Sequence, residues 1–170
     1  MKRLLPVFAV LFFLAGCKKN ISELPAPTGT GADTFGASVN GKLWTPQKFG
    51  IMPSAEILEA HYIPDGVIIN ARNFASSPTE SEFKFEIKGV NGPGVYNLNT
   101  ESGSYAYYVE RKITPTGEWK TNAQYTGTVT ITTDDRTNKI LAGTFQFQAA
   151  SLYGDAPVTV TDGRFDVKVR

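Results

Sequence analysis

The chain has 170 residues, of which 41% are hydrophobic, 12% aromatic and 19% charged, and its formal net charge is +1. This composition is ordinary for a globular domain. The near-neutral balance, with no basic stripe, excludes nucleic acid as an expected partner. The chain has one cysteine, so no disulfide can form within it, and the fold has to rest on its hydrophobic core.

The first 17 residues have the pattern of an export signal. Lys2 and Arg3 form a short positive region, and residues 4–14 are almost wholly apolar. That run is shorter than the roughly 20 residues that span a bilayer, but it fits the apolar part of a secretory signal. It ends in Leu14-Ala15-Gly16-Cys17, which resembles the bacterial lipobox.

The lipobox resemblance implies three parts of the chain: residues 1–16 as a signal peptide, 17–33 as a lipidated cysteine with a flexible tether, and 34–170 as a folded domain. Lipid attachment is expected at Cys17, and cleavage before it would leave 15 basic and 16 acidic side chains. Residues 18–33 have few large apolar side chains, two prolines and two glycines, a composition that favours a coil.

From residue 34 on, apolar residues alternate with polar ones, and turn residues separate the alternating runs. Asn40-Gly41 predicts a hairpin between residues 34–39 and 42–44, because both residues tolerate positive φ. Further strands are expected at residues 67–69, 82–88, 95–98, 105–109, 125–132, 140–149, 158–160 and 165–169. Turns are expected at residues 64–66, 91–94, 115–117, 134–138 and 153–155, and Asp162-Gly163 reads as a last hairpin turn.

Two stretches are less regular. Residues 47–54 have no clear period and contain Pro53, so we expect a loop there. Residues 55–63 could form a short helix capped by Ser54, but the turn at 64–66 leads directly into the β-branched run 67–69. We therefore expect a strand at 55–63.

About ten short strands joined by turns, with no long amphipathic helix, predict an all-β, antiparallel β-sandwich. A flattened lipocalin-like barrel is the alternative. The alternating residues define the expected core, which comprises Phe83, Phe85, Ile87, Phe145, Phe147, Phe165 and Val167.

Both ends of the expected domain resemble small Bacteroidetes lipoproteins of an uncharacterised family. The resemblance lies in residues 34–44 at its start, and in residues 143–147 and 160–167 near its end. These are core and turn residues, so the resemblance concerns the fold and implies no catalytic residue. Surface-export signals in this group are acidic runs after the lipidated cysteine. Only Glu23 follows Cys17 closely, so the periplasmic face of the outer membrane is expected, with surface exposure as the alternative.

The residue types for most catalytic sites are scarce. His61 is the single histidine, so it cannot supply a zinc site, and no serine lies in a Gly-x-Ser-x-Gly turn. The carboxylate pairs that could hydrolyse a glycan are Asp134/Asp135, Asp162/Asp166 and Glu82/Glu86. Asp134, Asp135 and Asn138 could also hold calcium with backbone carbonyls, although their spacing is not that of an EF-hand. We expect no catalytic residue, no metal and no cofactor.

Aromatic residues are the remaining candidates for a binding surface. Tyr108 and Trp119 are the two that the alternation and the polar surroundings favour as exposed, and exposed aromatics stack on sugar rings or anchor protein interfaces. We therefore expect a non-enzymatic cell-envelope lipoprotein that presents a β-domain for binding or assembly. The alternatives are a glycan- or peptide-binding module of an uptake system and a carboxylate-based glycan hydrolase.

Overall fold

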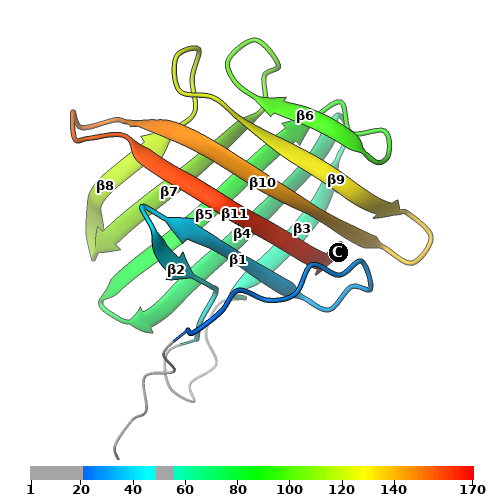
Figure 1. The fold of residues 1–170 in the computed structure, drawn as a ribbon, viewed down its shortest axis with the longest axis horizontal. Helices are drawn as coiled ribbons and strands as arrows, with labels where there is room; N and C mark the ends of the chain where they lie inside the picture. The colour runs from blue at the N-terminus through cyan, green and yellow to red at the C-terminus, as the bar shows by residue number, and fades with distance from the viewer. Residues whose placement is uncertain (1–20, 49–55) are drawn as a thin grey trace, which may run out of the picture.

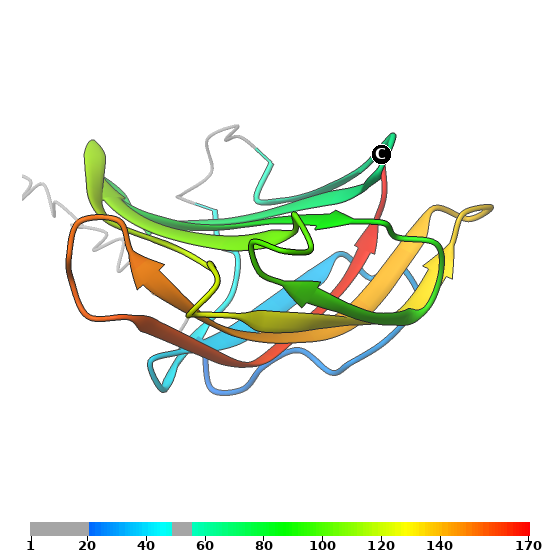
Figure 2. The same cartoon turned by 90° about the horizontal axis from the view of Figure 1, so that it is seen from above.

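The computed structural model describes residues 21–48 and 56–170. Within them, eleven β-strands form two layers that pack face to face (Figures 1 and 2). The strands are β1 (Thr34–Val39), β2 (Lys42–Trp44), β3 (Leu58–Ile63), β4 (Gly66–Ser76), β5 (Thr79–Lys88), β6 (Gly94–Leu98), β7 (Tyr105–Lys112), β8 (Thr114–Lys120), β9 (Gly127–Asp135), β10 (Ile140–Ser151) and β11 (Val158–Lys168). The expectation of an all-β, antiparallel sandwich is confirmed.

One layer, here called sheet A, has the strand order β2-β1-β11-β10-β9-β6, and the other, sheet B, has the order β3-β4-β5-β7-β8. The long strand β10 joins them, because its last residues, Ala150 and Ser151, pair with β8. At the other side, Ala60 of β3 meets Val169 in a parallel bridge. This near closure gives the sandwich some of the character of a flattened barrel and leaves few free strand edges.

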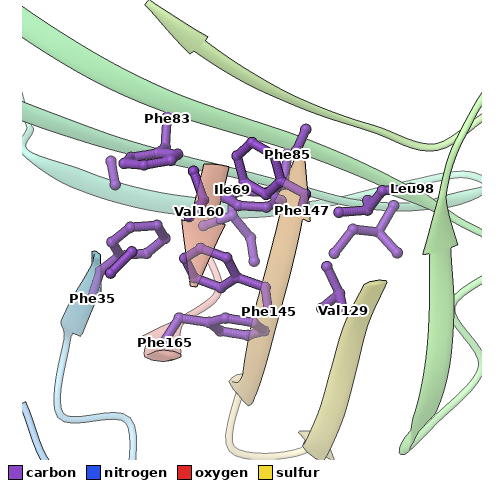
Figure 3. Packing of buried hydrophobic residues seen from close by; sticks show 14 of the residues in the cluster. Phe35, Ile69, Phe83, Phe85, Leu98, Val129, Phe145, Phe147, Val160 and Phe165 are labelled. Atoms are coloured by element: carbon purple, nitrogen blue, oxygen red, sulfur yellow. The ribbon is translucent and has the colours of Figure 1, made fainter. Parts of the chain in front are cut away.

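Aromatic rings from both layers fill the space between the sheets (Figure 3). Phe83 and Phe85 of sheet B meet Phe145 and Phe147 of sheet A, with a centroid distance of 4.8 Å between Phe85 and Phe145. Such tilted and edge-on contacts are the arrangements that aromatic pairs prefer. All seven residues of the expected core are at most 4% exposed, so that prediction is confirmed.

The first hairpin forms as expected. Asn40 and Gly41 have φ values of 47° and 78° and join β1 to β2. Residues 58–63 form strand β3, which confirms the strand over the helix there. The strand begins later than expected, because Glu56 and Ile57 precede it. The expected loop at 47–54 lies mostly outside the described residues.

The expected hairpin at Asp162-Gly163 is wrong, because both residues lie inside β11. There they form a β-bulge: β10 pairs Phe145 with Gly163 but Phe147 with Val160. The extra residue moves the buried positions from Val158 and Val160 to Phe165 and Val167, so both pairs face the core. Asp162 has a φ of 55°, a left-handed conformation used by both bulges and hairpin turns.

The expected turn at 115–117 is also wrong, since these residues belong to β8. The chain reverses two residues earlier, at Ile113, and Pro115 pairs with Arg111 of β7. Proline is tolerated in this part of β8 because the strand has a partner on only one side there. The turn expected at 134–138 is shorter than predicted, because Asp134 and Asp135 still belong to β9.

The segment before β1 lies against the outer face of sheet A. The Asp166 carboxylate accepts hydrogen bonds from the Thr28 hydroxyl at 2.6 Å, from the Thr30 backbone N–H at 2.9 Å and from the Gly31 N–H at 2.7 Å. Asp33 accepts one from the Lys168 N–H. Residues 28–33 are therefore held by the domain and differ from the flexible tether expected there.

Candidate ligand-binding face

The acidic pairs considered for hydrolysis are all engaged by other protein groups. Asp134 accepts a hydrogen bond from the Tyr62 hydroxyl at 2.8 Å and pairs with Arg136 at 3.0 Å. Burial, followed by the hydrogen bond to Asp134, raises the pKa of Tyr62 to about 12. Asp135 accepts hydrogen bonds from both the backbone and the side chain of Asn138. Asp134 and Asp135 thus serve different partners, and the described residues contain no cluster of three or more His, Cys, Asp or Glu that could hold a metal.

The other two pairs are divided in the same way. Glu82 accepts from Arg72 at 3.3 Å and from Arg111 at 3.2 Å, whereas Glu86 lies 3.7 Å from Lys88. Asp162 is exposed, whereas Asp166 is 1% exposed beneath the segment before β1. None of the three pairs presents two free carboxylates to one site.

His61 lies on β3 with 44% of its side chain exposed, and its Nε2 is 3.5 Å from the carboxylate of Glu59. That carboxylate also pairs with Arg72. The position agrees with a strand-face histidine. Cys17, the expected lipid-attachment residue, lies outside the described residues.

The expectation that Tyr108 is exposed is wrong. Its ring is 3% exposed and lies 4.8 Å from the ring of Phe83, because the inner face of β7 carries Ala106 and Tyr108. Trp119 is half-buried, 5.7 Å from Tyr108, and its indole N–H donates to the Ala156 carbonyl at 2.9 Å. The two rings pack against each other and form no exposed aromatic platform.

A different surface stands out on the outer face of sheet A. We call it the amide–hydroxyl face, and it consists of Asn97, Thr128, Thr130, Thr144, Gln146, Gln148, Thr159 and Thr161. Four strands contribute to it: β6, β9, β10 and β11. Each of these side chains points outward, while the residues next to it in the strand point into the core. These buried neighbours include Val129, Phe145, Phe147 and Val160.

Strand pairing aligns these side chains in rows across the sheet. Asn97 is opposite Thr128, which is opposite Gln146; in the next row Thr130 is opposite Thr144. Directly opposed side chains in antiparallel strands lie about 4.5–5.5 Å apart. Each row therefore presents a line of hydroxyl and amide groups at a close, regular spacing.

Two adjoining hollows lie along this face. One, of about 440 Å³, runs over Thr130 and Thr144, and the other, of about 530 Å³, runs over Asn97 and Gln148; both share Thr128 and Gln146. Within the described part of the chain, the side chains of Thr128, Thr130, Thr144, Gln146 and Gln148 make no hydrogen bond to protein. Their polar groups are thus available to a ligand.

The segment before β1 bounds this face on one side. Pro27 lines the first hollow together with Arg164 of β11, and the Arg164 guanidinium donates to the Pro25 carbonyl at 3.3 Å. Pro25 can lie this close to the sheet because β1 has a glycine beneath it: a Cβ on Gly36 would come within 2.8 Å of the proline ring. The bound segment therefore forms a wall of the hollow.

The sequence predicts only part of the amide–hydroxyl face. Alternation places Thr128 and Thr130 on one side of the strand expected at residues 125–132. The neighbours of that strand could not be predicted, because β6 and β10 reach it through pairings that no single run of residues reveals. The bulge in β11 also places Arg164 on this face. The hairpin predicted at Asp162-Gly163 would instead have put Arg164 in a separate strand.

A larger cavity, of about 1030 Å³, lies at the N-terminal side of the domain between residues 21–26, 33–35, 45–48 and 56–58. Its lining stops at Lys48 and resumes at Glu56, on either side of residues that the structure does not describe. Its walls are therefore only partly described, and we place no site there.

A family model described as "Domain of unknown function (DUF6252)" matches residues 33–168. The chain belongs to this family. The match spans all eleven strands in full, so the amide–hydroxyl face and Asp166 lie within the family domain, whereas Pro27 and Thr28 precede it. No curated protein and no solved structure matches the chain. The described residues contain no helix long and apolar enough to cross a membrane.

Proposed function

We propose that the protein is a non-enzymatic lipoprotein of the bacterial cell envelope whose β-domain binds a glycan on the amide–hydroxyl face. The observation that carries the proposal is the set of aligned hydroxyl and amide side chains without protein partners, Thr128, Thr130, Thr144 and Gln146 among them. A sugar chain presents hydroxyl groups at every residue, and such groups exchange hydrogen bonds with threonine and glutamine side chains as both donors and acceptors.

The shape of the surface favours an extended ligand. The two hollows adjoin across Thr128 and Gln146 and are open to solvent, so a chain could lie along them without the protein having to open. Four well-paired strands hold the side chains, and a rigid platform reduces the ordering cost of binding. A protein partner that uses this face for assembly is the second candidate, supported by the exposed side chain of Val95, which is 67% exposed beside Thr130.

Binding is tested with the full-length chain, purified in detergent, on a glycan array. The variants are Thr128→Val and Gln146→Met, which remove hydrogen-bonding groups with little change in side-chain size. Thr114→Val, at an exposed residue of β8 in the other sheet, is the matched control. We expect the first two to weaken a positive signal and the control to preserve it. If the control and the face variants behave alike, glycan binding lies elsewhere; an array without any signal contradicts the proposed function.

The enzyme alternative has its own readout. Oligosaccharides that bind on the array are incubated with the same protein, and the products are separated by chromatography. We expect binding without turnover. Turnover that disappears on changing Glu82 or Asp162 would show a hydrolase instead.

The envelope location rests on the leader and the lipobox. We propose that Cys17 carries the lipid and anchors the protein to the outer membrane, on the periplasmic face. The test is mass spectrometry of the N-terminal peptide from the membrane fraction, with Cys17→Ala as the control. An unmodified Cys17 in membrane-bound protein would contradict the anchor. Protease treatment of intact cells separates the periplasmic from the surface-exposed orientation, since only the latter is cleaved.

With residues 24–33 in contact with the domain, the tether that the sequence predicts would be about 7 residues long, from Cys17 to Glu23. A coil of that length spans roughly 13–16 Å. The anchor would then hold the domain close to the membrane surface and raise its effective concentration for ligands and partners in that layer.

A further inference from the structure

Arg164 is the cationic side chain of the first hollow on the amide–hydroxyl face. It lies on β11 directly opposite Thr144, in the row that continues through Thr130. The other residues of that row are uncharged, so a ligand lying along it meets one positive charge at the end bounded by Pro27.

The partners of this guanidinium are neutral. Its Nε donates to the Asp162 carbonyl at 3.2 Å and its Nη1 to the Pro25 carbonyl at 3.3 Å. These two hydrogen bonds restrict the side chain and leave further N–H groups of the fork free, because an arginine carries five donors. The guanidinium is thus oriented without being neutralised.

Arg164 differs in this respect from the other arginines that the structure describes. Each of those has a carboxylate oxygen within 4.0 Å: the set comprises Arg72, Arg111, Arg136 and Arg170. Within residues 21–48 and 56–170, Arg164 has none. An oriented, half-buried arginine without a carboxylate partner is suited to a carboxylate supplied by a ligand, since the planar fork matches two oxygens at once.

One acidic residue lines the same hollow. Asp162 is exposed and accepts a hydrogen bond from the Thr161 hydroxyl at 2.9 Å, and its carboxylate oxygens lie beyond ion-pair distance of Arg164. Its charge opposes an anionic ligand and weakens the attraction of the guanidinium. Removing the charge of Asp162 should therefore raise the affinity for an anionic ligand, whereas removing the charge of Arg164 should lower it.

We propose that Arg164 binds the carboxylate of an acidic sugar, so that the ligand of the amide–hydroxyl face is a uronic-acid-containing glycan. The inference rests on the proposed function and names its substrate class. The row of hydroxyl and amide groups binds the sugar hydroxyls, and Arg164 selects the chain that carries a negative charge at the Pro27 end.

The test uses two forms of one polymer, polygalacturonic acid and its methyl ester, which differ in the charge of the carboxyl group. Their oligosaccharides are titrated against the full-length chain in detergent. We expect the acid to bind about tenfold or more tightly than the ester, the factor for a charge-assisted hydrogen bond. The preference should shrink as salt concentration rises.

Four variants assign the charge to Arg164. Arg164→Gln should lower affinity for the acid to near that for the ester and lower ester binding much less, and Arg164→Lys should restore part of the difference. Asp162→Asn should raise affinity for the acid alone, and it keeps the left-handed φ that asparagine tolerates. Thr128→Val should weaken both forms. Thermal unfolding confirms that each variant is folded.

The outcomes separate the two proposals. Equal binding of acid and ester, or an equal loss of both in Arg164→Gln, overturns the role of Arg164 and leaves glycan binding in place. A preference for the acid that survives Arg164→Gln also overturns it. Absence of binding to either polymer, and to every sugar on the array, overturns the proposed function and this inference with it.

Discussion

The carboxylate of Asp166 accepts the hydroxyl of Thr28 at 2.6 Å, across 138 positions of the chain. The same carboxylate accepts hydrogen bonds from the backbone N–H groups of Thr30 and Gly31, so one buried side chain holds residues 28–31. This relationship connects the part of the chain that leads toward the expected anchor with the last strand of the domain.

Replacement of Asp166 should destabilise the fold. In Asp166→Asn, one acceptor oxygen becomes an NH₂ group that faces the N–H donors of the segment, so buried donors lose their partner. We expect a loss of about 2–3 kcal/mol in the free energy of unfolding. Urea denaturation of the full-length chain measures it. Thr28→Ala removes a single hydroxyl and should cost about 1 kcal/mol; equal losses in the two variants would contradict a central role for the carboxylate.

Stability should also depend on pH through this residue. Burial acts to raise the pKa of Asp166, but the hydrogen bonds from Thr28, Thr30, Gly31 and Ala32 outweigh it and hold the pKa below its usual value. A carboxylate with a depressed folded-state pKa stabilises the protein above its unfolded pKa of about 3.9, and the contribution is lost as pH falls through the folded pKa. Unfolding midpoints measured between about pH 6 and pH 2 should therefore fall less steeply in Asp166→Asn than in the wild type. Parallel curves would contradict this linkage.

The bulge in β11 requires a glycine at position 163. A Cβ there would lie 2.3 Å from the Phe145 ring and 2.5 Å from the Phe145 carbonyl oxygen, closer than real contacts allow. Gly163→Ala should therefore destabilise the fold by about 1–3 kcal/mol, the range for overpacking a core. Gly94→Ala is the matched control, because its Cβ would meet its nearest neighbour, the Tyr96 ring, at an ordinary 3.7 Å. Similar thermal midpoints for the two variants would show that the bulge adapts.

The aromatic core should account for a large part of the stability. Phe145→Ala and Phe165→Ala each remove a ring that is at most 4% exposed, and each should cost about 3–5 kcal/mol. The two rings lie 6.4 Å apart and share neighbours, so the double variant should deviate from the sum of the single variants. Urea denaturation gives all three values. Losses near those of a surface substitution such as Thr144→Ala would contradict the packing described here.

Local patterns predicted the strands well wherever alternation and turn chemistry agreed. Phe83, Phe85 and Ile87 alternate with charged residues and lie in the core, and Asn40-Gly41 forms the first hairpin. The errors occurred where one local signal fits two structures. Asp162-Gly163 suits both a hairpin and a bulge, since both use left-handed backbone conformations, and only the partner strands β1 and β10 distinguish them.

Site residues were harder to predict than strands. Alternation favours Tyr108 as exposed, and polar neighbours favour Trp119. Neither signal says which side of a strand is packed against the second sheet. Tyr108 faces inward because its neighbours across the interface, Phe83 among them, come from another part of the chain. The amide–hydroxyl face arises in the same way, from β6, β9, β10 and β11 brought together by pairing.

The sequence by itself determined the fold class and the phenylalanine core, because both depend on residues close together in the chain. It also predicts an export signal that ends at Cys17. The tertiary structure alone decided which residues share a surface. It aligned Thr130 with Thr144 across two strands, and its bulge placed Arg164 beside them. It also bound Thr28 to Asp166, since the segment before β1 gains hydrogen bonds to a buried carboxylate that its own composition does not reveal. Contacts between distant residues outweigh local preference at these positions because burial and pairing contribute more free energy there than the local backbone does.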